Sequence, residues 1–267
     1  MIDWRHWHNE PHLIGGLVLL GWLYAVLTSP LRERLAPPGT PWPRGQAICF
    51  YSSLVIFYLS VGSPLDQFGE RFLLSAHMIQ HQLIIYPAAA LFLVGLPSWA
   101  VRPATGRGGL RRLLRFFTNP VVCGLIFTIT YNAWHLPVLY DWALQSRPLH
   151  IAEHIMFFGA ALFYWWPLLS PSTEFPPLPF AVQLLYLLAV MIAMTPLFAY
   201  LAFFGGVIYP TYEFAPRLFP NFSPGDDQLL AAAIMELGGG LVVFIVSAIL
   251  FIRWHLPEER RRRLVSA

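Results

Sequence analysis

The chain has 267 residues, of which 57% are hydrophobic, 16% aromatic and only 12% charged. Soluble domains carry about 25% charged residues, so this composition excludes an ordinary soluble enzyme, a disordered chain and a nucleic-acid-binding protein. All 17 basic residues are Arg, and the formal net charge is +3. The sequence predicts an all-α, polytopic membrane protein, in which the placement of Arg matters more than the total charge.

Apolar stretches along the chain predict seven transmembrane helices in one integral membrane domain, 1–267, because about 20 apolar residues span a bilayer. The uncharged run 175–212 is long enough for two helices. We assign it to one, because three prolines suit its start and Gly205-Gly206 suits its end. In chain order we expect the helices over residues 13–30, 46–65, 75–98, 118–138, 149–168, 178–204 and 228–252.

The Arg residues divide unequally between the two sides of this seven-helix arrangement. The side that holds the C-terminus carries 13 of them, and the side that holds the N-terminus carries 4. By the positive-inside rule the N-terminus is outside and the C-terminus is cytoplasmic. The first 12 residues lack the pattern of a cleavable signal peptide. We expect a multi-pass protein of the bacterial cytoplasmic (inner) membrane.

The histidines gather on the predicted outer side. His77 and His81 lie four residues apart at the start of the third predicted helix, and His150 and His154 repeat this spacing at the start of the fifth. Residues at i and i+4 share one helix face, so each pair is able to hold one metal ion. His135, near the outer end of the fourth helix, lies at a similar depth. The sequence therefore predicts an outward-facing intramembrane metal site.

Several other side chains near that depth are predicted to support the site. Glu153 and Asp141 are expected to hold ring nitrogens of the histidines, and Glu236 lies inside the seventh predicted helix. Met78 and Met194 are expected to serve as soft ligands.

The polar residues also have structural interpretations. A lone intramembrane His such as His135 often makes only a helix–helix hydrogen bond. Asp227 sits just above the predicted site, and its neighbour Asp226 suits a helix N-cap. The tail residues His6, His8 and His12 suit a solvated interfacial segment better than a metal site.

Both Cys residues lie near the opposite, inner ends of their helices, at positions 49 and 123, and form no CxxC pair. A disulfide scaffold and a thiolate zinc site are excluded. Imidazole with thioether and carboxylate ligands suits copper or zinc.

Four motifs resemble those of the multispanning CtaG-type family of bacterial cytochrome c oxidase assembly factors. They are HMIQH at 77–81, WHLPVLYDWAL at 134–144, LHIAEH at 149–154 and a last-helix pattern over 227–240. The resemblance covers roughly residues 71–252. It implies an assembly factor for a haem–copper oxidase, acting at copper insertion, with oxidase subunits, an extracytoplasmic copper donor protein and membrane lipid as partners.

The residues leave two other functions open. A membrane-embedded zinc hydrolase of the ceramidase-like type would bind zinc through three His and use Glu153 or Glu236 as the base. A haem b or quinol redox protein would use His residues from facing helices as axial ligands. The closely spaced His pairs favour a small ion over haem, and the surplus of histidines at one depth, with Met78 and Met194 close by, fits a protein that exchanges its metal.

Overall fold

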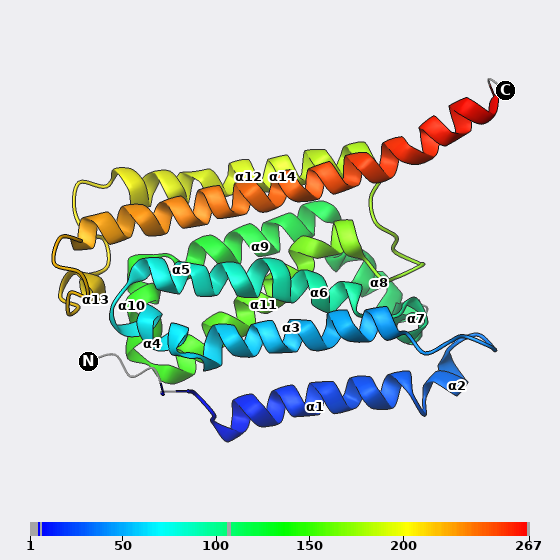
Figure 1. The fold of residues 1–267 in the computed structure, drawn as a ribbon, viewed down its shortest axis with the longest axis horizontal. Helices are drawn as coiled ribbons and strands as arrows, with labels where there is room; N and C mark the ends of the chain where they lie inside the picture. The colour runs from blue at the N-terminus through cyan, green and yellow to red at the C-terminus, as the bar shows by residue number, and fades with distance from the viewer. Residues whose placement is uncertain (1–4, 6, 106–107, 266–267) are drawn as a thin grey trace.

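The computed structural model describes residues 5, 7–105 and 108–265, and every regular element in these ranges is helical (Figure 1). For residues 256–265 only the backbone is described. The elements are α1 (Pro11–Thr28), α2 (Arg32–Leu35), α3 (Arg44–Gly62), α4 (Pro64–Arg71), α5 (Leu74–Leu83), η1 (Ile84–Ala88), α6 (Ala89–Val94), α7 (Ser98–Thr105), α8 (Gly108–Phe117), α9 (Pro120–Trp134), α10 (Pro137–Gln145), α11 (Arg147–Leu169), α12 (Phe180–Phe203), α13 (Pro210–Glu213) and α14 (Pro224–Val265).

The protein is a multi-pass membrane protein. Among the described residues, five helical segments are long and apolar enough to cross a membrane, and six if the bent pair α8–α9 forms one span. The predicted fifth span corresponds to α11, which is not among them. His150, Glu153 and His154 make this helix more polar, and they lie inside the bundle. The number seven therefore stays a prediction.

Helix α11 runs through the middle of the bundle (Figure 1). It packs against α9 on one side and against η1 and α6 on another, while α12 and α14 pack together, α14 against α5 and α12 against α9. Helix α1 lies at the edge of the bundle, and its main neighbour is α3. A helix in this central position can direct polar side chains into the protein interior rather than into lipid.

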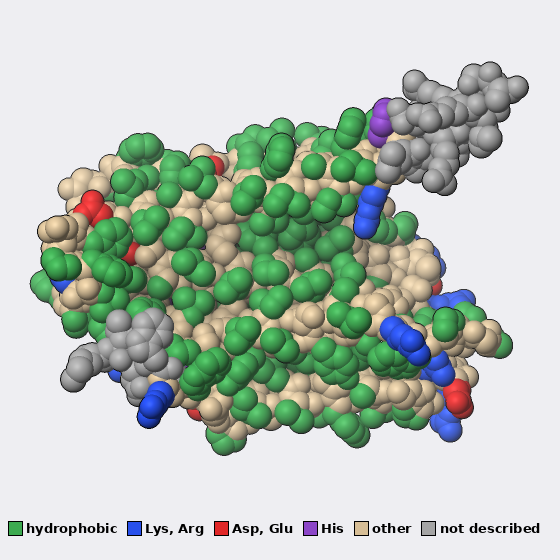
Figure 2. Space-filling view, in the orientation of Figure 1, with side chains coloured by type: hydrophobic (Ala, Val, Ile, Leu, Met, Phe, Trp, Pro, Cys, Tyr) green, Lys and Arg blue, Asp and Glu red, His purple; other side chains and the backbone are tan. Residues whose placement is uncertain are grey.

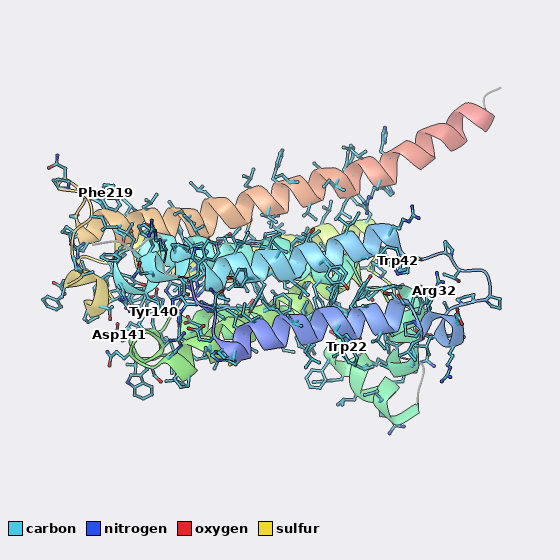
Figure 3. All side chains as sticks on the ribbon, turned by 60° about the horizontal axis from the view of Figure 1, so that its bottom comes forward. Trp22, Arg32, Trp42, Tyr140, Asp141 and Phe219 are labelled. Atoms are coloured by element: carbon cyan, nitrogen blue, oxygen red, sulfur yellow. The ribbon has the colours of Figure 1, made fainter. Side chains whose placement is uncertain are left out.

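Apolar side chains are spread along the face of the bundle that Figure 2 shows. Val18, Leu185 and Phe244 are each more than 60% exposed, as expected for a surface that faces lipid tails. Figure 3 shows Tyr140 and Asp141 near one end of the bundle and Arg32 and Trp42 near the other. We call these the α4 end, which also carries α10 and α13, and the α7 end, which also carries α2 and α8.

The third predicted span is one continuous segment whose geometry changes in the middle. It begins as α5, becomes a π-helix over Ile84–Ala88 and ends as α6. Pro87 lies inside the π-helix, where it lacks the N–H that an α-helix would use. The indole of Trp165 on α11 donates a hydrogen bond to the carbonyl of Ile85 at 2.8 Å. This bond ties the π-helix to the central helix, and such π-helical turns often accompany functional sites.

The start of α5 is fixed by a side chain that is far away in the sequence. Asp227, at the first turn of α14, accepts hydrogen bonds from the backbone N–H groups of Leu74 at 2.6 Å and Ser75 at 3.1 Å. These N–H groups have no partner within their own helix. The carboxylate thus caps α5 from another helix and fixes the turn that carries His77.

Candidate metal centre

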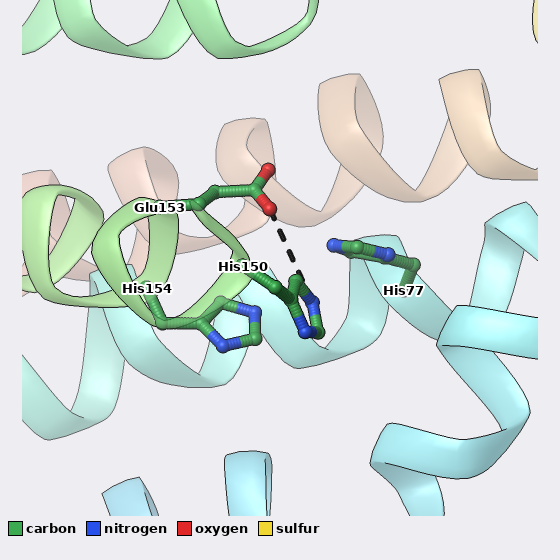
Figure 4. A group of neighbouring side chains, drawn as sticks. All are labelled: His77, His150, Glu153 and His154. Carbon is green, nitrogen blue, oxygen red and sulfur yellow. Dashed lines mark ion pairs between the residues drawn. The ribbon is translucent and has the colours of Figure 1, made fainter. Parts of the chain in front are cut away.

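Four side chains from two helices form a compact group at the α4 end of the bundle. His77 comes from α5, whereas His150, Glu153 and His154 come from α11 (Figure 4). Each of the four offers one ligand atom, and these atoms all lie within 4.8 Å of one another. The spacings of three and four residues place the α11 side chains on one helix face. We call this group the inner centre.

The inner centre is fully enclosed by protein. None of its four residues is more than 5% exposed, although a buried imidazole or carboxylate needs a partner to offset its lost hydration. Among the described residues, His150 Nε2, His154 Nε2 and both carboxylate oxygens of Glu153 are buried without a hydrogen-bond partner. Each such group costs roughly 1–3 kcal/mol. A bound cation would satisfy all of them together, so these residues fit a metal ion.

The Nδ1 atoms of His77 and His150 already have partners. Glu70 on α4 places its Oε1 2.7 Å from His150 Nδ1, and the hydroxyl of Tyr212 lies 3.3 Å from His77 Nδ1. A partner on Nδ1 sets the orientation of the ring and leaves Nε2 for a metal. Both rings are therefore fixed in orientation; His150 Nε2 has no hydrogen-bond partner, whereas His77 Nε2 faces His81 Nε2 at 2.8 Å.

The other two predicted histidines lie beside the inner centre. His81 Nε2 is 2.8 Å from His77 Nε2 and 3.6 Å from a carboxylate oxygen of Glu153. The His135 ring lies 5.7 Å from the His81 ring, centroid to centroid. Its Nδ1 is 2.7 Å from the carbonyl oxygen of Tyr131, and its Nε2 is 3.4 Å from the sulfur of Met78. The five histidines thus lie in one buried cluster, and which of them bind metal stays a prediction.

The remaining predicted supporting residues lie in other surroundings. Asp141 accepts a hydrogen bond from Thr211 at 3.0 Å, and Glu236 accepts one from Thr195 of α12 at 3.0 Å. Met194 packs against the hydrophobic core. None of these three belongs to the groups of adjacent ligand atoms among the described residues. Asp227 caps α5, the helix that carries His77, and the role of all four residues in a metal site stays a prediction.

Sequence reasoning did not find the two carboxylates of α4. Asp66 and Glu70 lie four residues apart, which is the spacing that identified the His pairs, but they fall outside the predicted spans. Burial raises the pKa of Asp66 to about 6. Burial, the largest single effect, would also raise the pKa of Glu70, but the hydrogen bond from His150 and the charges of His150, His8 and Arg71 together lower that pKa. Glu70 is therefore the more strongly ionised of the two.

A cavity of about 310 Å³ reaches the inner centre from the side of α1. His150 and His154 lie at its inner wall, and apolar side chains of α1, α3 and α11 line most of the rest. Its polar end, at the α4 end of the bundle, is formed by six residues: His8, Glu10, His12, Asp66, Glu70 and Arg147. The cavity offers a route by which a small ion can reach two of the four inner ligands.

A comparison with protein families gives one match that spans most of the chain. The family described as cytochrome c oxidase caa3 assembly factor (Caa3_CtaG) matches residues 22–256. The chain belongs to this family. No curated protein and no solved structure matches the chain. The family match confirms the family predicted from the motifs.

The match to the caa3 assembly factor family covers more of the chain than the four motifs do. The match begins within α1 and ends near the last described side chains of α14. It includes all four residues of the inner centre, whereas His8 and His12 precede it. The buried ligand group therefore lies within the matched part of the chain.

Proposed function

We propose that this caa3 assembly factor binds copper at the inner centre and hands it to a haem–copper cytochrome c oxidase. The observation that carries the proposal is the set of buried imidazole and carboxylate atoms without partners in the inner centre. A site with three imidazoles and a carboxylate suits copper or zinc. Family membership associates the chain with oxidase assembly, and an oxidase of this class requires copper.

Transfer requires release as well as binding, and the inner centre has a feature that supports release. His81 Nε2 lies 2.8 Å from His77 Nε2 and outside the four-residue group. A neighbouring imidazole can replace a ligand one step at a time, so the ion never loses its whole coordination at once. We infer a non-catalytic protein that exchanges its metal rather than retaining it.

We further propose that the α4 end faces the extracytoplasmic side, with seven spans, the N-terminus outside and the C-terminus cytoplasmic. Many Arg side chains gather at the α7 end (Figure 2), and Arg is enriched on the cytoplasmic side of membrane proteins. In the bacterial cytoplasmic membrane, the inner centre of this protein would then receive copper from a donor protein on the extracytoplasmic side. Its acceptor would be an oxidase subunit that is still being assembled.

A zinc hydrolase is the second candidate function, because the largely apolar cavity leads to His150 and His154. A lipid chain could lie along this cavity, with Glu153 as the base beside a bound Zn²⁺. Haem is disfavoured, since the His77 and His150 rings pack edge to face with centroids 5.4 Å apart. That contact leaves no room for a macrocycle between them.

The test compares purified wild-type protein with the variant His154→Ala. We expect wild-type protein to bind copper at the inner centre and the variant to lose the ion of that centre, while oxidase in cells that carry the variant lacks copper. Added copper should partly restore the oxidase. The proposal would be overturned in favour of the hydrolase by either of two results. One is wild-type protein that binds no copper. The other is a variant that leaves oxidase copper unchanged but abolishes hydrolysis of a lipid amide.

A further inference from the structure

A second group of metal-ligating side chains lies at the polar end of the cavity. His8, Asp66 and Glu70 each offer a ligand atom, and these atoms all lie within 4.8 Å of one another. His8 Nε2 is 3.3 Å from Asp66 Oδ2. Asp66 and Glu70 share one face of α4, because they are four residues apart. We call these three residues the outer group.

The backbone holds His8 in place within the outer group. Its backbone N–H donates to the carbonyl of Gly62 at 2.9 Å. On either side of it, Trp7 stacks on Tyr58 with ring centroids 5.9 Å apart, and Asn9 accepts a hydrogen bond from the Tyr58 hydroxyl at 2.6 Å. Residues 7–9 are thus docked on the last turns of α3, and His8 is not part of a solvated segment as the sequence indicated; His6 lies outside the described residues.

The His8 ring can present a nitrogen to a cation. Glu10 Oε1 and the donating Arg147 guanidinium lie 3.1 and 3.0 Å from Nδ1, and Nε2 lies 3.3 Å from Asp66 Oδ2. A cation beside Asp66 would take the Nε2 lone pair and leave the ring proton on Nδ1, where Glu10 accepts it in place of the contact from Arg147. Arg147 also forms an ion pair with Glu10. The charge of Glu10 is thereby balanced, and Asp66 and Glu70 remain as the two carboxylates of the outer group.

The outer group is connected to the inner centre through one side chain. Glu70 Oε1 lies 2.7 Å from His150 Nδ1, and the other nitrogen of the same ring belongs to the inner centre. His150 and His154 are 4% and 5% exposed, have unpartnered Nε2 atoms and line the same cavity as the outer group. These buried nitrogens are independent evidence that the cavity receives a ligand.

We propose that His8, Asp66 and Glu70 form a second, receiving site, which takes a divalent transition-metal ion from the cavity and passes it through His150 to the inner centre. This proposal rests on the proposed metal-binding function. One imidazole with two carboxylates suits a divalent ion of borderline softness, such as Cu²⁺ or Zn²⁺, and suits monovalent copper poorly. An ion that leaves Glu70 meets His150 as its next ligand, since the two side chains are already in contact.

The test counts the metal ions that the full-length protein binds in detergent. Wild-type protein, stripped with a chelator, is loaded with Cu²⁺, and its metal content is measured together with its electron paramagnetic resonance spectrum. We expect two Cu²⁺ ions and two overlapping signals in wild-type protein. Asp66→Asn and His8→Ala should each bind one ion and keep the signal of the inner centre. The asparagine can still accept the hydrogen bond that Gln80 donates to Asp66.

Two further variants separate the two proposals. His12→Ala is the matched control, because His12 lines the cavity but belongs to neither ligand group, and it should bind two ions. His154→Ala should lose the inner signal and keep the outer one. If Asp66→Asn and His8→Ala both retain two ions, the receiving site is refuted and the inner centre stands. If His154→Ala also retains two ions, the proposed function is refuted.

Discussion

Replacing His154 with alanine removes one of the four ligands of the inner centre and leaves the rest of the bundle in place. Structural zinc sites with four ligands contribute about 10–16 kcal/mol of binding free energy, or roughly 3 kcal/mol per ligand. A loss of that size corresponds to an affinity about 100-fold weaker. The imidazole has an unpartnered Nε2 in the described structure, so its removal breaks no hydrogen bond of that nitrogen.

The assay is thermal unfolding in detergent, followed by intrinsic fluorescence, with Zn²⁺ as a redox-inactive probe. At a Zn²⁺ concentration about 100 times the wild-type Kd, binding stabilises the folded state by roughly 2.7 kcal/mol. The same concentration is close to the Kd of the variant, so the expected gain falls to about 0.4 kcal/mol. At about 2 °C per kcal/mol, the midpoint should rise by about 5 °C in wild-type protein and by about 1 °C in the variant.

His135→Ala is the matched control, because His135 is equally buried but lies outside the four-residue group. Its stabilisation by Zn²⁺ should remain near 5 °C. All proteins in the comparison carry Asp66→Asn, so that the outer group contributes nothing to the shift. Equal stabilisation of the His154 variant and the control would refute the four-ligand assignment. A loss in the control alone would place the metal at His135 instead.

Three other predictions concern the fold and its orientation. Gly95→Ala would place a Cβ 2.7 Å from a backbone nitrogen of α3 and should lower the free energy of unfolding by about 1–3 kcal/mol. Gly159→Ala, with open space around it, should not. Equal midpoints of thermal unfolding for the two variants would contradict the close packing at Gly95. Asp227→Ala leaves two buried N–H groups of α5 without their acceptor and should cost about 1–3 kcal/mol for each and weaken metal binding; unchanged Zn²⁺ affinity would contradict its supporting role. A reporter fused after Ala267 should read cytoplasmic and one in the loop 205–226 extracytoplasmic; the reverse would overturn the orientation.

The sequence predicted the all-helical architecture and the gathering of five histidines, because both depend on local spacing. Apolar runs of about 20 residues and His pairs four residues apart can be recognised without tertiary information. The resemblance of the motifs also identified the family that the comparison found. Predicting the helices and the His pairs required only the period of the α-helix and the thickness of the bilayer.

Contacts between distant segments could not be predicted in this way. The cap that Asp227 provides to α5 joins residues more than 150 positions apart, and the sequence around Asp227 suggested only a local helix start. Glu70 on α4 and His150 on α11 likewise meet at 2.7 Å although they are far apart in the sequence. Helix α11 is less apolar than the other predicted spans because it carries His150, Glu153 and His154. The bundle encloses these same side chains in the inner centre.

The arrangement of ligands on α5 and α11 links metal binding to the packing of the bundle. Because His77 lies on α5 and the other three ligands lie on α11, a bound ion connects two helices that otherwise meet mainly through η1, α6 and the bond from Trp165 to Ile85. The cap from Asp227 adds α14 to the same connection, since it fixes the turn that carries His77. A change in the position of α14 would therefore move His77 relative to α11 and alter the coordination.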